Sequence, residues 1–125
     1  MMRLKSDLVD LILSGLSRQL DKIEAKWEDK FAIGVILASF GYPDSPRKGD
    51  IISGLESVSA DIKIFHSGTS IKDNELYTAG GRVLCVVGME NNIELAQKSV
   101  YNAISKIKFN GMQYRKDIAN SAIKC

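Results

Sequence analysis

The feature that most constrains the fold is an uncharged apolar run from Ala32 to Ala38. It is rich in β-branched residues and is followed by a turn-forming segment, residues 41–46, that contains both prolines of the chain. A short run of this composition is typical of a strand that is buried on both faces. We therefore predict a buried central strand over residues 32–38, followed by a loop.

Four shorter runs have the composition of β-strands. They are residues 62–66, 69–71, 75–78 and 82–87. Asp73-Asn74 separates the second run from the third, and Gly80-Gly81 separates the third from the fourth. Two-residue segments of this kind favour tight hairpin turns. The economical interpretation is a series of consecutive antiparallel hairpins, which together form a β-sheet meander.

Two segments have the spacing of helices. Residues 6–17 begin with Ser6, whose hydroxyl can cap a helix, and they are apolar over more than half of the helical circumference. Such a helix needs apolar cover on several sides. Asn91 and Glu94 resemble a capping box ahead of an amphipathic helix that continues to residue 108.

The remaining segments are less regular. Residues 17–30 are polar but keep apolar residues at helical spacing up to Trp27, which indicates a short second helix or an ordered linker. Asn110-Gly111 is expected to end the long helix, and residues 114–125 leave room for one more strand and a terminal turn of helix. The predicted class is α+β, an antiparallel β-sheet meander packed with two or three helices.

The composition excludes several classes of function. The chain has 125 residues, 45% of them hydrophobic, which is enough for one compact core. Its formal charge of +2 comes from interspersed residues of both signs, which argues against nucleic acid as a partner. The longest apolar stretches, residues 33–40 and 83–87, are too short to cross a bilayer. The N-terminus has no apolar stretch of signal-peptide length, so we expect a cytoplasmic protein.

Cysteine and histidine usage argues against a disulfide framework or a metal site. Cys85 lies in a strand-like run and Cys125 is the last residue, so both are expected to be reduced thiols. One histidine and two distant cysteines form no recognisable zinc site, so we expect no metal on this chain alone. His66 suits either proton transfer near neutral pH or hydrogen-bonded packing beside Ile62 and Ile64. No nucleophile–base pair or glycine-rich nucleotide motif occurs, so no catalytic residue is predicted.

Two segments have the residues of an anion site. The loop of residues 41–50 carries Arg47, Lys48 and Gly49, and a pre-bent loop with cations and free amides suits a phosphate. The alternative is a solvated loop whose cations maintain solubility. Gly80-Gly81 permits close approach to the backbone, and Arg82 can bind a phosphate or carboxylate through two hydrogen bonds. The alternative there is a glycine hairpin with an exposed arginine.

Six segments, taken in order, resemble successive parts of one enzyme family. They are residues 3–8, 41–43, 48–55, 65–69, 78–84 and 111–118. In these segments the chain is similar to glycinamide ribonucleotide synthetases, the phosphoribosylamine-glycine ligases that contain an ATP-grasp domain. Two segments, His66-Ser67-Gly68-Thr69 and residues 80–84, favour this family over related ATP-grasp carboxylases. The departures are Asp44 and Pro46, which indicate a local difference in loop conformation, and Ser67, where the family usually has alanine.

The resemblance implies the C-terminal part of a larger ligase. Such enzymes join glycine to 5-phosphoribosylamine through a glycyl phosphate, and the full-length enzyme uses ATP and magnesium. The family's metal ligands precede the first segment, so the resemblance implies that this chain alone binds neither cofactor and is inactive. Residues 1–30 are then a helical segment and linker at the end of the ATP-grasp domain, and residues 31–125 are a C-terminal domain at the substrate cleft. The expected substrate contacts are Arg82 and Lys48 first, His66 and Thr69 second, and Arg3 and Lys5 third.

The expected partners follow from the resemblance. They are the N-terminal and ATP-grasp portion of the same enzyme and the substrates glycine and 5-phosphoribosylamine, with no nucleic acid and no membrane. A mostly apolar first helix without cover is also expected to permit self-association. Two other interpretations are a free-standing interaction module that docks through this helix and the C-terminal domain of a related ATP-grasp carboxylase. Met1 aligns with an interior methionine of the family, which fits a proteolytic remnant, a deliberate fragment or a split reading frame.

Overall fold

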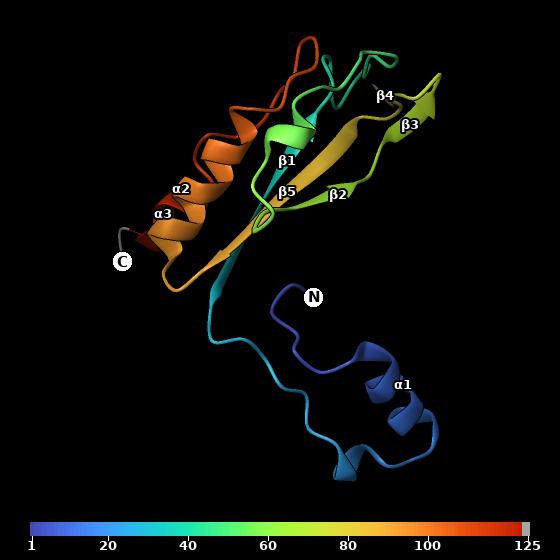
Figure 1. Ribbon diagram of the computed structural model, residues 1–125, viewed down its shortest axis with the longest axis vertical. Coiled ribbons are helices and arrows are strands. Elements are labelled where there is room, and N and C mark those ends of the chain that lie inside the picture. The colour runs from blue at the N-terminus through green and yellow to red at the C-terminus, as the bar shows by residue number, and fades with distance from the viewer. Residues whose placement is uncertain (124–125) are drawn as a thin grey trace.

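The computed structural model describes residues 1–123, which form two antiparallel sheets and a small number of helices (Figure 1). The α+β class and the antiparallel sheets predicted from the sequence are confirmed. The elements are α1 (Leu8–Leu16), η1 (Leu20–Lys22), β1 (Phe31–Ala38), η2 (Leu55–Ser57), β2 (Lys63–His66), β3 (Thr69–Lys72), β4 (Glu75–Thr78), β5 (Arg82–Glu90), α2 (Ile93–Ile104) and α3 (Asn120–Ile123).

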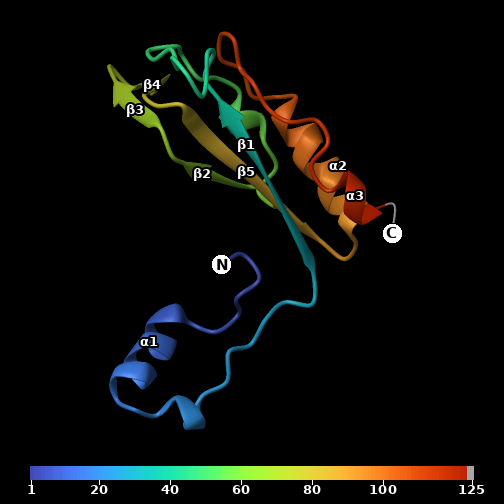
Figure 2. The same cartoon turned by 180° about the vertical axis from the view of Figure 1, so that it is seen from behind.

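The larger sheet has the strand order β1-β5-β2, and α2 covers one of its faces (Figures 1 and 2). Val35 and Leu37 of β1 lie on the covered face, opposite Val86 and Leu84 of β5. All four side chains are buried and belong to the main hydrophobic core. Burying an aliphatic side chain of this size contributes about 1.5–3 kcal/mol. The core therefore fixes β5 as the centre of the sheet.

β1 is an edge strand, so the predicted central position of residues 32–38 is wrong. Its residues alternate between exposed and buried over most of its length, and Gly34 and Ile36 lie on the face away from α2. Phe65 and Cys85 share that face, because Cys85 is directly opposite both Ile36 and Phe65 in the ladders. We call these four residues the open sheet face. The lack of charge in β1 thus reflects two apolar faces, one of which has no cover within the described chain.

One of the two predicted hairpins forms and the other does not. Asp73-Asn74 joins β3 to β4, and both residues have positive φ angles, 51° and 63°, as a tight hairpin turn requires. The hairpin predicted at Gly80-Gly81 is absent because β5 already pairs with β1 on one edge and with β2 on the other. The free edge of β4 contacts the loop after β1, where the Thr78 N–H donates to the Asp50 carbonyl at 2.9 Å. Gly80-Gly81 therefore connects two separate sheets.

α2 is the predicted amphipathic helix, but its cap and its end differ from the prediction. Asn92, rather than Asn91, is the N-cap, and its side-chain oxygen accepts a first-turn N–H at 2.8 Å. The helix ends at Ile104 rather than at residue 108, because Lys108 enters an antiparallel bridge with Ser53. The buried face is the one that the spacing predicted and consists of Ala96, Val100, Ala103 and Ile104.

The N-terminal segment, residues 1–30, stands apart from the sheet and α2 (Figures 1 and 2). Asp7 caps α1 by accepting a first-turn N–H at 2.7 Å, whereas Ser6, the predicted cap, accepts the Lys26 N–H. The apolar side chains of α1 are largely exposed, and Leu16 reaches 78%. The cover that the sequence predicted for this helix is therefore not supplied by the described residues.

The two irregular segments contain little secondary structure. Residues 17–30 form the short helix η1 and then an extended stretch, so each of the two predicted alternatives describes part of the segment. α3 is the predicted terminal turn of helix, whereas the strand expected near it does not form within residues 114–123.

The described residues also bear on the cysteine and membrane predictions. Cys85 forms no disulfide within the described residues, and partial burial raises the pKa of its thiol. Cys125 lies outside the described residues. No helix within residues 1–123 is long and apolar enough to cross a membrane.

Candidate functional site

Three loops meet near the end of β1 and border a surface pocket of about 550 Å³. We call it the loop pocket. Its residues come from the proline loop after β1, the turn between β2 and β3, and the connection from β4 to β5. They are Tyr42, Pro43, Pro46, Ser67, Gly68, Ala79, Gly80, Gly81 and Arg82. Arg82 is charged and the other lining residues are neutral, which gives the pocket a basic character.

Glycine is required in the loop pocket because a neighbouring loop lies directly against the backbone at Gly68 and Gly81. A Cβ atom on Gly68 would lie 2.6 Å from the Arg82 carbonyl oxygen and 2.8 Å from the Gly80 Cα. A Cβ atom on Gly81 would lie 2.5 Å from the Tyr42 ring. These distances are well below van der Waals contact. The loops can therefore approach this closely only where side chains are absent.

Ser39 attaches the glycine connection to the end of β1. Its N–H donates to the Gly81 carbonyl at 2.9 Å, and its hydroxyl donates to the Gly80 carbonyl at 2.7 Å. Ser39 is fully buried, and a buried polar group without a partner would be costly. These two bonds therefore hold the backbone of the pocket in a defined position.

A β-bulge determines where Arg82 points. The ladder between β1 and β5 loses register between Leu37 and Ala38, and the extra residue on β5 is Val83. The Val83 carbonyl accepts two N–H groups from the turn after β2, at 3.0 and 3.1 Å. Val83 and Leu84 are both fully buried, so the usual alternation along the strand is interrupted. Arg82 consequently begins β5 with an exposed side chain, and bulges commonly redirect side chains in this way next to functional sites.

The loop pocket presents hydrogen-bond donors that have no acceptor within residues 1–123. The Gly80 and Gly81 N–H groups donate no hydrogen bond there, and the Arg82 guanidinium forms no ion pair there. Neighbouring backbone N–H groups and an arginine are the groups that bind a phosphate or carboxylate. The pocket can therefore bind and orient an anionic group.

The loop of residues 41–50 offers fewer free amides than its sequence suggested, because the N–H groups on both sides of Lys48 donate to backbone carbonyls. The Arg47 side chain is also occupied, by the Asp50 carboxylate at 2.8 Å and by the Asn110 carbonyl at 2.9 Å. Arg47 therefore holds the loop in place. Lys48 is exposed and has no ion pair within residues 1–123, but it is not among the residues that line the loop pocket.

His66 and Thr69 contact each other beside the loop pocket. His66 Nδ1 lies 3.1 Å from Thr69 Oγ1, which closes the turn between β2 and β3 with a hydrogen bond. The two residues between them, Ser67 and Gly68, line the pocket, whereas His66 and Thr69 do not. In the ladders His66 is opposite Leu84 and Thr69 is opposite Thr78, so the pair flanks the turn that lines the pocket without lining it itself.

Arg3 and Lys5 lie in the N-terminal segment and contact Glu28 there. Arg3 Nε donates to the Glu28 carbonyl at 3.1 Å, and Lys5 Nζ lies 3.5 Å from the Glu28 carboxylate. The structure does not bring these two cations together with Arg82. The expected substrate contacts therefore separate into a group at the loop pocket and a group on the N-terminal segment.

Replacing Gly68 with alanine is expected to lower the free energy of unfolding by about 1–3 kcal/mol, because the new methyl group meets backbone atoms that cannot turn away. Urea unfolding followed by circular dichroism measures the change. Gly15→Ala is the control, since its Cβ would have no neighbour closer than 3.8 Å. Equal stability of Gly68→Ala and the parent chain would contradict the close contact of the loops.

With the geometry described, the chain can be compared with known families. The family described as "Phosphoribosylglycinamide synthetase, C domain" matches residues 32–121. The match covers more than half of the chain. This chain belongs to that family. The resemblance that the sequence suggested, most specifically in residues 65–69 and 78–84, is thereby confirmed.

Relatives of the phosphoribosylglycinamide synthetase family match nearly the whole chain. The phosphoribosylamine–glycine ligase of Ralstonia nicotianae is 46% identical over 99% of this chain, and that of Neisseria meningitidis serogroup B is 49% identical over 98%. This chain spans 29% of the length of each. The crystal structure of the phosphoribosylamine–glycine ligase of Thermotoga maritima matches 87% of this chain with a TM-score of 0.72 and 35% identity, and 26% of that protein is covered.

Tyr42, which lines the loop pocket, and Ser39, which anchors its glycine connection, were not among the site residues predicted from the sequence. Tyr42 lies in a segment, residues 41–43, that resembles the phosphoribosylglycinamide synthetase family, so its position at a site could have been inferred. Ser39 has a weaker signal, namely a small polar residue at the end of an apolar strand. Its two bonds to a connection 41 and 42 positions later in the chain become visible only in the folded structure.

Proposed function

We propose that this chain is the C-terminal part of a phosphoribosylamine–glycine ligase and acts together with the rest of a longer protein. The observation that carries the proposal is the match of residues 32–121 to the C domain of that family. The exposed apolar side chains of α1 and the open sheet face support it, because large apolar surfaces are normally covered by another domain or chain.

The proposed reaction joins glycine to 5-phosphoribosylamine at the expense of ATP. In ligases of this type, the glycine carboxylate takes the γ-phosphoryl group and the ribosylamine nitrogen then displaces phosphate from the glycyl phosphate. Residues 1–123 contain no group of three or more His, Cys, Asp or Glu side chains that could hold a metal ion. We assign ATP and magnesium to the remaining part of the proposed enzyme. The work of this chain is to bind substrate, orient it and exclude water.

Within that reaction, the loop pocket is proposed to bind the phosphate of 5-phosphoribosylamine. A phosphate complements the Arg82 guanidinium and the Gly80 and Gly81 N–H groups. Lys48 is proposed as a second cation that attracts the phosphate from a longer distance. The hydrogen-bonded pair of His66 and Thr69 is proposed to hold the turn that forms one wall of the site.

The two parts of the chain are proposed to have different roles. Residues 1–30 would complete the ATP-grasp domain, and residues 31–125 would close the substrate cleft, with the cytoplasm as the compartment. The N-terminal segment is held together by its own contacts, such as the bridge between Leu4 and Trp27. Arg3 and Lys5 would meet substrate only in the assembled enzyme. Without the remaining part, the exposed apolar residues of α1 would permit self-association.

The proposed role of Arg82 can be tested in a chimera in which this chain replaces the matching part of the Ralstonia nicotianae ligase. Arg82→Ala is expected to raise the KM for 5-phosphoribosylamine about 10- to 100-fold, because a charge-assisted hydrogen bond of about 1.5–3 kcal/mol is lost. The KM for ATP should change little, since Arg82 is proposed to contact only the ribosyl phosphate. Steady-state kinetics with each substrate varied in turn measure both constants.

Two further variants complete this test. Arg82→Lys should restore part of the affinity, because it keeps the charge but not the two-pronged hydrogen bonding. Lys72→Ala is the matched control, since Lys72 is an exposed cation on β3 outside the loop pocket. An unchanged KM for 5-phosphoribosylamine in Arg82→Ala would refute the assignment.

A further inference from the structure

One buried hydroxyl contacts the backbone of the loop pocket. Among residues 1–123, Ser39 and Thr78 are the buried polar residues. Ser39 does not line the pocket, but Gly80 and Gly81, whose carbonyls it binds, do. A hydroxyl in a core is costly unless it is hydrogen-bonded, and a carbonyl that loses its partner there is costly as well. Ser39 and the glycine connection therefore depend on each other.

The hydrogen bond from Ser39 fixes the direction of the Gly81 N–H. The Gly80 carbonyl and the Gly81 N–H belong to one peptide unit, which is trans. In a planar trans unit the C=O and the N–H point in opposite directions. The carbonyl accepts the buried Ser39 hydroxyl at 2.7 Å, so the N–H is directed away from Ser39. This N–H has no acceptor within residues 1–123.

The glycine connection has no side chains with which to hold this direction. Glycine is needed at both positions: a Cβ atom on Gly80 would lie 3.2 Å from the Gly68 Cα, and one on Gly81 would lie 2.5 Å from the Tyr42 ring. Glycine also has the greatest backbone freedom, so a peptide unit between two glycines rotates at low cost. Ser39, at the end of the packed strand β1, supplies the constraint that the glycines lack.

We propose that Ser39 is a positioning residue for anion binding in the loop pocket. This inference rests on the proposed function, in which the pocket binds the phosphate of the substrate. Ser39 does not touch the substrate itself. It holds the Gly80–Gly81 peptide so that the Gly81 N–H faces the anion before the anion arrives, which lowers the ordering cost of binding. The same bond polarises the peptide unit and makes that N–H a stronger donor.

A titration of the isotopically labelled chain with ribose 5-phosphate, followed by amide chemical shifts, tests the proposal. Saturable shifts of the Gly80 and Gly81 amides are expected, with a dissociation constant in the millimolar range because the site is exposed. Ser39→Ala should weaken binding about three- to tenfold, which corresponds to the loss of about one hydrogen bond. Arg82→Ala should weaken binding at least as much and shows that the probe occupies the loop pocket.

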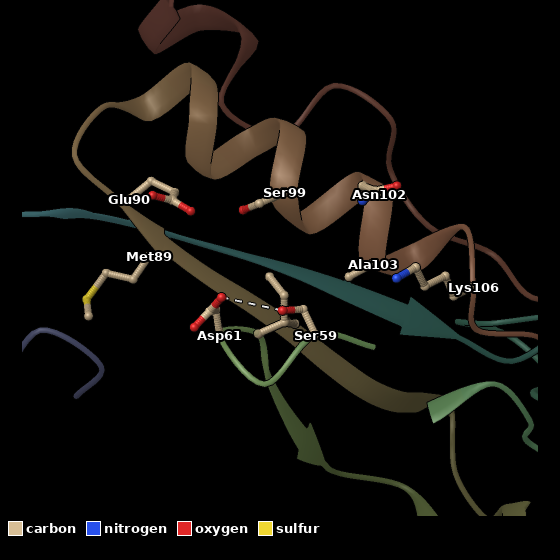
Figure 3. Close-up of a pocket in the computed structure, with 9 residues that line it drawn as sticks. Ser59, Asp61, Met89, Glu90, Ser99, Asn102, Ala103 and Lys106 are labelled. Carbon is tan, nitrogen blue, oxygen red and sulfur yellow. Dashed lines mark hydrogen bonds between the residues drawn. The ribbon is translucent and has the colours of Figure 1, made fainter. Parts of the chain in front are cut away.

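Two control variants separate this role from a general loss of stability. Ser99→Ala makes the same chemical change on α2, beside Glu90 and therefore at the opposite end of β5 from Arg82 (Figure 3). Ile104→Val removes a methylene group from the buried face of α2, so it weakens the core slightly without altering the pocket. Both controls should bind ribose 5-phosphate as the parent does. A well-dispersed amide spectrum confirms that each variant is folded.

The chimera described above supplies a second measurement. Ser39→Ala should raise the KM for 5-phosphoribosylamine about three- to tenfold and leave the KM for ATP unchanged, whereas a loss of folded enzyme lowers the apparent kcat and leaves both KM values unchanged.

Three results would overturn the role of Ser39. The first is that Ser39→Ala binds the probe as the parent does while Arg82→Ala binds it more weakly, which leaves the loop pocket as the proposed phosphate site. The second is that Ile104→Val weakens binding as much as Ser39→Ala does. The third is that the parent shows no saturable shift, since Ser39 then has no anion to serve. The ligase proposal is separate from this outcome, because the turnover of the chimera tests it independently.

Discussion

Replacing Leu84 with alanine is expected to lower the free energy of unfolding by about 3–5 kcal/mol. Leu84 is fully buried on β5, the central strand, and lies directly opposite Leu37 in the ladder. β5 is paired on both edges and covered by α2, so the surrounding structure can collapse only a little into the new space. Urea unfolding of the 125-residue chain, followed by circular dichroism, measures the loss.

The control for this prediction is Ile71→Ala. Ile71 lies on β3 and is 77% exposed, so its replacement should change the free energy of unfolding by no more than about 0.5 kcal/mol. A loss of less than about 1 kcal/mol for Leu84→Ala would mean that β5 is not the centre of the core.

The elements that the sequence predicted correctly depend on nearby residues. The turn between β3 and β4 needs positive φ angles, and Asp73-Asn74 belongs to the few dipeptides that adopt them readily. α2 needs a side-chain cap and apolar residues on one face, and both lie within a short stretch of chain. Even here the cap is displaced by one residue, from Asn91 to Asn92, because both asparagines have the chemistry of a cap.

The elements that the sequence did not predict depend on distant residues. Gly80-Gly81 has the composition of a hairpin turn, but β5 pairs with β1 and β2 instead of β4, and a local pattern does not contain that choice. Residues 32–38 were predicted to form a strand that is buried on both faces, but one face of β1 is open. An uncharged strand has the same sequence pattern whether its second face is covered by this chain or is left open.

In the candidate site, too, local signals were visible in the sequence and contacts with distant residues were not. Arg82 follows a Gly-Gly dipeptide, a local signal that identified it before its surroundings were known. Arg47 carried a similar signal, yet its guanidinium binds the carbonyl of Asn110, which lies 63 positions away. The two arginines therefore have different surroundings, which sequence spacing alone does not distinguish.

If the proposed function is correct, the largest effect on activity comes from separating this chain from the rest of the proposed ligase. The chain alone should show no glycine-dependent formation of ADP, because residues 1–123 supply neither a nucleotide motif nor a metal-binding cluster. The chimera with the Ralstonia nicotianae ligase should form glycinamide ribonucleotide at a rate within about tenfold of that enzyme, since the replaced part is 46% identical. The same ligase truncated before the matching part is the control.

The most direct measurement is therefore the turnover of this chimera with glycine, 5-phosphoribosylamine and ATP, compared with the truncated ligase. We expect the chimera to be active and both separate parts to be inactive. A folded chimera whose turnover is no higher than that of the truncated ligase would contradict the proposal that this chain completes a phosphoribosylamine–glycine ligase.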